Sequence, residues 1–218
     1  MERGRLIVFE GIDGAGTTTQ SALLHETLEA SFGRCLLTRE PSDGPVGMLI
    51  RQVLRGRLRG GDGSGGTSPF DARSLALLFA ADRLDHLYGE VVPALKAGVH
   101  VISDRYLLSS LAYQSLDMEL AWIREINRLA ARPDLTILLD VPAREALQRL
   151  QISRAGSELF EKPEALERVA ETYRSLASHG GGRSVVTING VGTVDAVRRA
   201  VWKAVQPNLP ITANGSVP

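Results

Sequence analysis

The sequence has a single cysteine, no excess of either charge and no long apolar run. Because Cys35 has no second cysteine to pair with, an intramolecular disulfide framework is excluded, and we expect a reducing, cytoplasmic location. The 25 basic and 25 acidic residues cancel, which argues against general binding to nucleic acid or to membranes. No apolar run approaches the roughly 20 residues that span a bilayer. A strand predicted from Leu6 leaves no room for a signal peptide ahead of it, so we expect none.

What the chain does have is the composition of one globular α/β domain. Its 218 residues are 44% hydrophobic and 23% charged, which is enough apolar material for a sizeable core. Short apolar runs alternate with longer helical patterns. The predicted strands are 6–9, 34–38, 99–103, 135–139 and 184–188, and the predicted helices are 17–30, 46–54, 71–97, 109–131, 143–151, 163–178 and 194–204. This alternation predicts a three-layer α/β fold, in which a five-stranded, mostly parallel sheet has helices on both faces.

Three segments depart from this alternation. Residues 55–69 are rich in glycine and polar side chains, which predicts a mobile surface loop. Residues 153–162 are polar and suit a flexible lid, within a single domain that we expect to span 1–205. The tail over 206–218 contains three prolines and little to bury, so we expect it to be flexible.

A glycine-rich turn over residues 11–18 joins the first predicted strand to the first predicted helix. Its backbone N–H groups and the positive end of the helix dipole can converge there on a phosphate. The phosphate-binding pattern G-x-x-x-x-G-K-[ST] has a lysine where this chain has Thr17, whereas Thr18 keeps the hydroxyl expected on magnesium. Glycine pairs at this spacing also arise by chance in a chain with 22 glycines, so a tight turn without a ligand is the alternative.

A second candidate lies where the predicted strand 99–103 ends, at Asp104 and Arg105. Proteins with a phosphate-binding loop place an acidic group for magnesium at such a strand end, because phosphoryl transfer needs the phosphate charge neutralised. A guanidinium beside it could hold an acceptor phosphate through paired N–H donors. The alternative is a surface ion pair, but a glycine loop upstream favours the functional interpretation.

Other segments are ambiguous on spacing alone. Phe79 and Arg83 share a helix face, so they could stack on a base and hydrogen-bond it, or be a core ring and a solvated cation. Arg51 belongs to a basic cluster, which favours a solvated face, although it could anchor an acceptor phosphate. Residues 38–41 end the second predicted strand, at the sheet edge where the other candidates lie, and residues 109–114 begin a helix. The four histidines show neither metal-ligand spacing nor a paired nucleophile, so we interpret them as structural.

Together these pieces resemble the thymidylate kinase family of P-loop nucleoside monophosphate kinases. The matching text is FEGIDGAGTTTQ (9–20), TREP (38–41), LLFAADR (77–83), VISDRYLLSSLAYQ (101–114), PDLTILLDV (133–141) and SELFEKPEALERVAETY (157–173). The resemblance implies a three-layer P-loop kinase fold that transfers the γ-phosphoryl group of ATP to dTMP with Mg²⁺, giving dTDP for dTTP biosynthesis. It also implies a homodimer whose partners are small nucleotides, not nucleic acid or membranes.

The resemblance also assigns roles to individual residues. ATP would bind to Gly11, Gly14, Ala15, Gly16, Thr17, Thr18 and Arg149, the last lying against the adenine. Thr18 and Asp104 would hold magnesium, and the catalytic residues would be Asp13, Asp104, Arg105 and Arg154, with Glu161 in the same lid as Arg154. The dTMP pocket would comprise Asp13, Arg39, Glu40, Arg51, Phe79, Arg83, Arg105, Ser110, Tyr113 and Gln114. Within it, Asp13 would face the sugar 3′-hydroxyl side, Phe79 would stack on thymine with Arg83 reaching the base, Arg105 would hold the phosphate, and Tyr113 would lie near the 2′ position.

Three departures from the family pattern leave the activity open. Thr17 removes a point charge from the transferring phosphates, and Glu-Leu at 158–159 stands where the lid often has Asp-Arg. An arginine at such a position can raise the rate by about 10³ to 10⁵. The missing loop lysine and the missing lid arginine therefore both affect the phosphoryl-transfer step. Residues 42–44 replace the more usual glycines. We therefore weigh an active dTMP kinase, in which Arg154, Arg149 or main-chain amides replace the lysine, against a catalytically weakened nucleotide-binding protein and a kinase for another acceptor.

Overall fold

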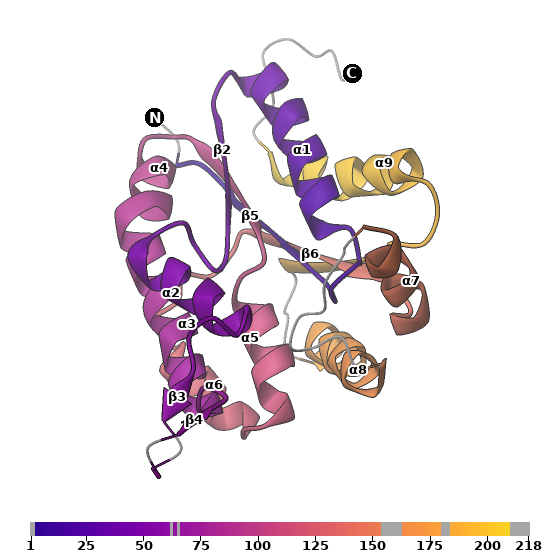
Figure 1. The fold of residues 1–218 in the computed structure, drawn as a ribbon. Helices are drawn as coiled ribbons and strands as arrows, with labels where there is room; N and C mark the ends of the chain where they lie inside the picture. Colours follow the sequence, from indigo (N-terminus) through magenta and orange to yellow (C-terminus); the bar gives the residue numbers. More distant parts are fainter. Residues whose placement is uncertain (1–2, 62, 65, 154–162, 180–183, 210–218) are drawn as a thin grey trace.

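A computed structural model describes residues 3–61, 63–64, 66–153, 163–179 and 184–209. Its centre is a five-stranded sheet in the order β2-β5-β1-β6-β7 (Figure 1). The strands are β1 (Leu6–Glu10), β2 (Cys35–Arg39), β5 (His100–Asp104), β6 (Leu135–Asp140) and β7 (Val185–Asn189). Every pairing in this sheet is parallel, and each predicted strand lies within one residue of its expected position. The predicted parallel sheet is therefore confirmed.

Helices cover both faces of the sheet (Figure 1). On one side α1 (Thr17–Phe32) contacts β2 and β5 and packs against α9 (Val194–Val205). On the other side α8 (Pro163–His179) contacts β6 and β7, and α5 (Leu107–Tyr113) packs against α8. The remaining α-helices of the described chain are α2 (Pro45–Leu54), α3 (Ala72–His86), α4 (Val92–Lys96), α6 (Leu120–Ile126) and α7 (Ala143–Ser153). The three-layer α/β prediction is confirmed.

The parallel register brings the carboxyl ends of the strands together at one edge. Phe9 of β1 and Arg39 of β2 both pair with Asp104 of β5, and Glu10 pairs with Leu138 of β6. Ligands of open α/β sheets bind at this edge. The motifs predicted from three separate strands therefore meet in space.

The helix predicted over 109–131 is divided in the structure. It is found as α5, a 3₁₀ turn at Gln114–Leu116 and α6, with an extended residue, Glu119, before α6. The last turn of α6 ends at Asn127, whose side-chain oxygen accepts a hydrogen bond from the guanidinium of Arg83. The extended backbone at Glu119 separates the 3₁₀ turn from α6, and α6 ends before Asn127, short of residue 131. A helical periodicity reveals neither feature.

Two other segments differ in detail from the prediction. The helix expected over 71–97 runs from α3 through a π-helical turn (Leu87–Val91) into α4. The loop over 55–69, expected to be irregular, contains a short antiparallel pairing of β3 (Gly60–Gly61) with β4 (Thr67–Ser68). Its mobility stays a prediction.

The lid and most of the tail lie outside the described residues. Residues 154–162 and 210–218 belong to this group, and so do 180–183. Directly after α9, residues 206–208 form a 3₁₀ turn, so the tail expected to begin at 206 is ordered at its start. Of the helices that the structure describes, none has both the length and the apolar character needed to cross a membrane.

Candidate active site

The turn between β1 and α1 has the geometry of a phosphate-binding loop. Gly14 and Gly16 have positive φ values of 83° and 95°, which glycine adopts with little strain. Gly16 is the N-cap of α1 and offers no side chain to the helix, so the first-turn N–H groups are available to an anion. A Cβ atom at Gly14 would lie 2.4 Å from the carbonyl oxygen of Ala146. The loop therefore rests directly on the backbone of α7.

Thr17, at the position of the absent lysine, is the first residue of α1 and is buried. In the described part of the chain, two arginines hydrogen-bond to carbonyl oxygens of the loop. Arg105 Nη1 donates to Gly11 O at 2.9 Å, and Arg149 Nη1 lies 3.5 Å from the carbonyl oxygens of residues 14 and 15. The loop without a lysine is thus flanked by two guanidinium groups.

Arg149 is tied to this place from three directions. Besides the loop carbonyls, its Nη2 donates to Glu145 Oε1 at 2.6 Å and to Gly190 O at 3.0 Å. The side chain is 32% exposed. It joins α7, the phosphate-binding loop and the turn after β7, and its predicted contact with adenine stays a prediction.

Asp104 and Thr18 form the group predicted for magnesium. The Thr18 hydroxyl donates to Asp104 Oδ2 at 2.5 Å, while Asp104 Oδ1 is buried and accepts no hydrogen bond from the described residues. An unpaired buried carboxylate oxygen beside a hydroxyl fits a hard cation, bound directly or through water. The described residues contain no group of three His, Cys, Asp or Glu side chains able to hold a metal. Phosphate oxygens and water would therefore complete the coordination of Mg²⁺.

Arg105 has a left-handed backbone with φ 74°, which no other described non-glycine residue adopts. Such a conformation costs of order 1–3 kcal/mol and persists only where the surroundings fix it. The Arg105 N–H donates to Phe9 O at 2.9 Å, and Ser103 Oγ donates to the Arg105 carbonyl at 2.7 Å. The guanidinium reaches Asp13 Oδ1 at 2.6 Å and lies 5.4 Å from the ring centre of Tyr113. The backbone of Arg105 is therefore strained, and the backbone and the side chain are both held in a defined position.

A buried carboxylate beside Arg105 was not predicted. Glu10 accepts from the Tyr106 N–H at 3.1 Å, the Ser109 hydroxyl at 2.6 Å and the Tyr173 hydroxyl at 3.1 Å. Burial raises the pKa of Glu10, although the hydrogen bond from Ser109 and the charge of Arg105 act against the rise. The only signal in the sequence was an acidic residue at the end of an apolar strand.

A cavity of about 270 Å³ opens beside Arg105, at the carboxyl edge of the sheet. All ten residues predicted for the acceptor nucleotide line it: Asp13, Arg39, Glu40, Arg51, Phe79, Arg83, Arg105, Ser110, Tyr113 and Gln114. Apolar side chains of Leu54, Leu75 and Met118 also line it. Guanidinium groups next to an apolar wall suit a planar ring that carries a phosphate. The individual binding roles stay predictions.

Arg83 is 1% exposed, so the alternative of a solvated cation is wrong. Its guanidinium donates to Glu40 Oε2 at 2.9 Å, to Ser110 Oγ at 2.9 Å and to Asn127 Oδ1. Phe79, one turn earlier on α3, is only partly buried and lines the cavity. From within the core, Arg83 therefore links three elements around the cavity: the loop after β2, α5 and the end of α6.

The loop after β2 is fixed by Arg51. Its Nη2 donates to Pro41 O at 2.6 Å, and its Nη1 donates to Ser42 O. The side chain is 21% exposed, so Arg51 is partly buried, whereas Arg55, Arg57 and Arg59 of the same basic cluster are exposed, as a solvated face requires. Arg51 both lines the cavity and shapes its rim.

His86 lies behind the same loop. Its Nε2 is 2.8 Å from Thr38 Oγ1, and its Nδ1 is 3.5 Å from Glu40 Oε1. Burial lowers the pKa of His86, but the hydrogen bond to Glu40 and the charges of Glu40 and Glu90 outweigh burial, so the pKa is raised overall. The ring contacts the Glu40 oxygen that Arg83 does not bind, and its structural role stays a prediction.

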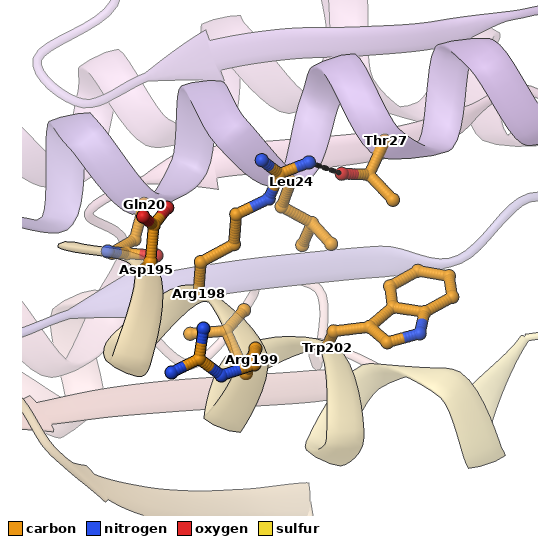
Figure 2. A pocket seen from close by; sticks show the side chains of 8 residues that line it. Gln20, Leu24, Thr27, Asp195, Arg198, Arg199 and Trp202 are labelled. Atoms are coloured by element: carbon orange, nitrogen blue, oxygen red, sulfur yellow. Dashed lines mark hydrogen bonds between the residues drawn. The ribbon is translucent and has the colours of Figure 1, made fainter. Parts of the chain in front are cut away.

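Another cavity, of about 440 Å³, lies between α1 and α9 (Figure 2). It is lined by Gln20, Leu24, Thr27, Asp195, Arg198, Arg199, Val201 and Trp202, and Arg198 Nη2 donates to Thr27 Oγ1 at 3.3 Å. None of the residues predicted for ATP, dTMP or magnesium lines it. The candidate active site is therefore the smaller cavity at the sheet edge.

Residues 9–201 match the family model described as thymidylate kinase. The chain belongs to the thymidylate kinase family. A probable thymidylate kinase of Pyrococcus abyssi is 39% identical over 208 residues, which cover 95% of this chain and 98% of the relative. One from Thermococcus gammatolerans is 43% identical over 175 residues, covering 80% and 83%, and one from Methanococcus maripaludis strain C7 is 44% identical over 173 residues, covering 79% and 77%. The predicted resemblance is confirmed.

The family's expected site is only partly visible in the structure. The phosphate-binding loop, the pair of Thr18 and Asp104, and the acceptor residues meet at one edge of the sheet. Arg154 and Glu161 of the expected lid lie outside the described residues. The buried residues Glu10, Tyr173 and Asn127 were not predicted, although each hydrogen-bonds to the site.

Proposed function

We propose that the chain is a dTMP kinase, which transfers the γ-phosphoryl group of ATP to dTMP and releases dTDP and ADP. The observation that carries the proposal is the cavity of about 270 Å³ beside the phosphate-binding loop, in a chain of the thymidylate kinase family. The partners are two small nucleotides. A cytoplasmic location rests on the single cysteine and stays a prediction.

In this reaction a phosphate oxygen of dTMP forms a bond to the γ-phosphorus of ATP. The bond from that phosphorus to the β–γ bridging oxygen breaks, and ADP leaves. Arg105 would hold the attacking phosphate, and the first-turn N–H groups of α1 would hold the phosphates of ATP. Thr18 and Asp104 would hold Mg²⁺, which supplies neutralisation of the phosphate charge when bound. Positioning and electrostatics carry nearly all of the rate in such a transfer.

Recognition of a deoxynucleotide is supported by the contact between Tyr113 and Asp13. The Asp13 N–H donates to the Tyr113 hydroxyl at 2.9 Å, which fixes the phenol ring against the loop. With Asp13 facing the 3′-hydroxyl side, the ring of Tyr113 would occupy the space that a ribose 2′-hydroxyl needs. Phe79 would stack on the thymine, and Arg83 would orient Ser110 beside it.

Main-chain amides and Arg149 take the place of the absent lysine in this proposal. Arg149 contacts the carbonyl oxygens of residues 14 and 15, and a positive charge there polarises the peptide groups of the loop. We expect Arg149→Ala to raise KM for ATP and to leave KM for dTMP unchanged. We expect Thr17→Lys to change kcat by less than about tenfold, since a rise of about 10³ would match a cation that nothing had replaced.

A coupled assay of ADP release with ATP, Mg²⁺ and dTMP tests the activity directly. We expect turnover with dTMP, less with dUMP and least with UMP. A preference for UMP would contradict the proposal that the Tyr113 ring occupies the space of a ribose 2′-hydroxyl. Near-zero turnover together with dTMP binding in calorimetry would favour the alternative of a catalytically weakened nucleotide-binding protein, for which the described residues offer no support.

A homodimer is part of the proposal. Large apolar side chains are exposed on two helices that pack side by side, at Met48 and Leu49 of α2 and at Leu77 and Leu84 of α3. Tyr88, in the turn that continues α3, is 84% exposed. Exposed apolar surface of this kind marks an interaction site. Light scattering should therefore give twice the chain mass, and Leu77→Asp should reduce it to the chain mass.

A further inference from the structure

Glu10 and Tyr173 are 163 residues apart in the sequence and meet beside Arg105. Tyr173, in α8, lies with its hydroxyl 3.1 Å from Glu10 Oε2, 2.8 Å from Ser109 Oγ and 3.5 Å from Arg105 Nη1. Glu10 is 0% and Tyr173 1% exposed. A buried carboxylate and a buried phenol at this spot require partners, because unpaired polar groups in a core are costly.

The hydrogen bonds of this cluster converge on one guanidinium. Glu10 Oε1 accepts from the Tyr106 N–H, and Glu10 Oε2 accepts from the hydroxyls of Ser109 and Tyr173. Arg105 Nη1 in turn donates to Ser109 Oγ at 3.2 Å and to the Tyr173 hydroxyl at 3.5 Å. Burial and the negative charge of Glu10 raise the pKa of Tyr173, so its phenol stays protonated and can donate.

The backbone of Arg105 depends on the same carboxylate. Its left-handed conformation is stable only where neighbouring contacts over-determine it. Glu10 holds the N–H of Tyr106, the residue that follows Arg105, while Phe9 O holds the N–H of Arg105 itself. Consecutive residues of β1 therefore fix both peptide groups around Arg105.

Without the Tyr173 hydroxyl, Arg105 Nη1 would lose one acceptor and keep Gly11 O at 2.9 Å and Ser109 Oγ at 3.2 Å. Asp13 Oδ1 would still attract Nη2 at 2.6 Å. The balance between these contacts decides where the charge of Arg105 lies when a phosphate enters the cavity.

We propose that Glu10 and Tyr173 are positioning residues, which hold the Arg105 guanidinium where the phosphate of the acceptor nucleotide binds. The inference rests on the proposed function and adds α8 to the elements that build the acceptor site. Neither residue touches the substrate in this proposal, and both act through Arg105.

The test is the steady-state kinetics of Tyr173→Phe, which keeps the ring and removes the hydroxyl. We expect KM for dTMP to rise and kcat/KM for dTMP to fall by about tenfold, with KM for ATP unchanged. The matched control is Thr172→Val, which removes the neighbouring hydroxyl of α8, a group that donates within the helix to Arg168 O at 2.8 Å. We expect this control to keep both KM values. A loss of folded protein alone would lower kcat and leave both KM values unchanged, and this result would overturn the positioning role.

The variant Glu10→Gln supplies a second, independent test of the proposal. It removes the charge but keeps the shape, and we expect a larger loss of kcat/KM for dTMP than in Tyr173→Phe. If the two residues act as a unit, the double variant loses no more than Glu10→Gln alone, whereas losses that multiply would overturn the proposal. If Glu10→Gln does not fold, Tyr173→Phe decides alone. A wild-type protein without turnover overturns the proposed function and this inference with it, whereas an active wild type with an unaltered Tyr173→Phe overturns only the inference.

Discussion

The contact between Gly14 and α7 allows a sharp test of the phosphate-binding loop. In Gly14→Ala the new methyl group would lie 2.4 Å from the Ala146 carbonyl oxygen, and the residue would keep a φ of 83°. The left-handed conformation costs about 1–2 kcal/mol for a residue with a side chain. The clash is with backbone, which cannot rotate away, and overpacking of this kind costs about 1–3 kcal/mol more. We expect a total loss of about 2–5 kcal/mol in the free energy of unfolding.

The control for this substitution is Gly33→Ala, at the other end of α1. Gly33 has a φ of 78°, and a Cβ there would meet nothing within 4 Å. It should therefore lose only the conformational part, about 1–2 kcal/mol, which lowers Tm by roughly 2–8 °C in a chain of this size. Chemical denaturation measures both losses, and the coupled assay should show a raised KM for ATP in Gly14→Ala alone. Equal destabilisation of the two variants would refute the packing of the loop on α7.

Three further predictions concern residues around the site and the single thiol. The raised pKa of His86 adds stability that is fully present below its ordinary value of 6.5 and is lost as pH rises through the raised value. The free energy of unfolding should therefore fall as pH rises above about 6.5, and His86→Gln should flatten this dependence in urea titrations. Burial raises the pKa of Cys35 to about 12, so a thiol reagent at pH 8 should label the native protein far more slowly than the unfolded chain. Arg83→Met should cost about 3–5 kcal/mol, because it removes one partner of the buried ion pair between Arg83 and Glu40, and calorimetry should show a loss of dTMP affinity.

The sheet and the edge that carries the site follow from local patterns. Each strand is a short apolar run between turn residues, so Leu6 and Leu135 were placed as strand starts without error. Parallel strands bring their carboxyl ends to one edge, which predicts that the turn after β1 and Asp104 meet. The acceptor residues were assigned through the resemblance to a family, and the structure places all of them around one cavity. Their roles await the kinetic tests above.

What the sequence did not reveal depends on tertiary contacts. Glu10 and Tyr173 become neighbours only because α8 packs on β6 and β7, and neither residue stands in a pattern of its own. Arg83 has the spacing of a surface cation, yet Glu40 and Asn127 supply the partners that allow it to be buried. The helix predicted over 109–131 also ends early, before Asn127, the residue that accepts a hydrogen bond from Arg83.

The left-handed backbone at Arg105 lowers the stability of the fold, whereas the side chain at the same position serves the reaction. Replacement by glycine would relieve the torsional penalty at φ 74° and would remove the charge that faces the acceptor phosphate. A library screened for heat resistance alone would therefore tend to enrich glycine at this position and return inactive proteins. Engineering this enzyme for higher thermal stability therefore requires selection for catalytic activity and for stability at the same time.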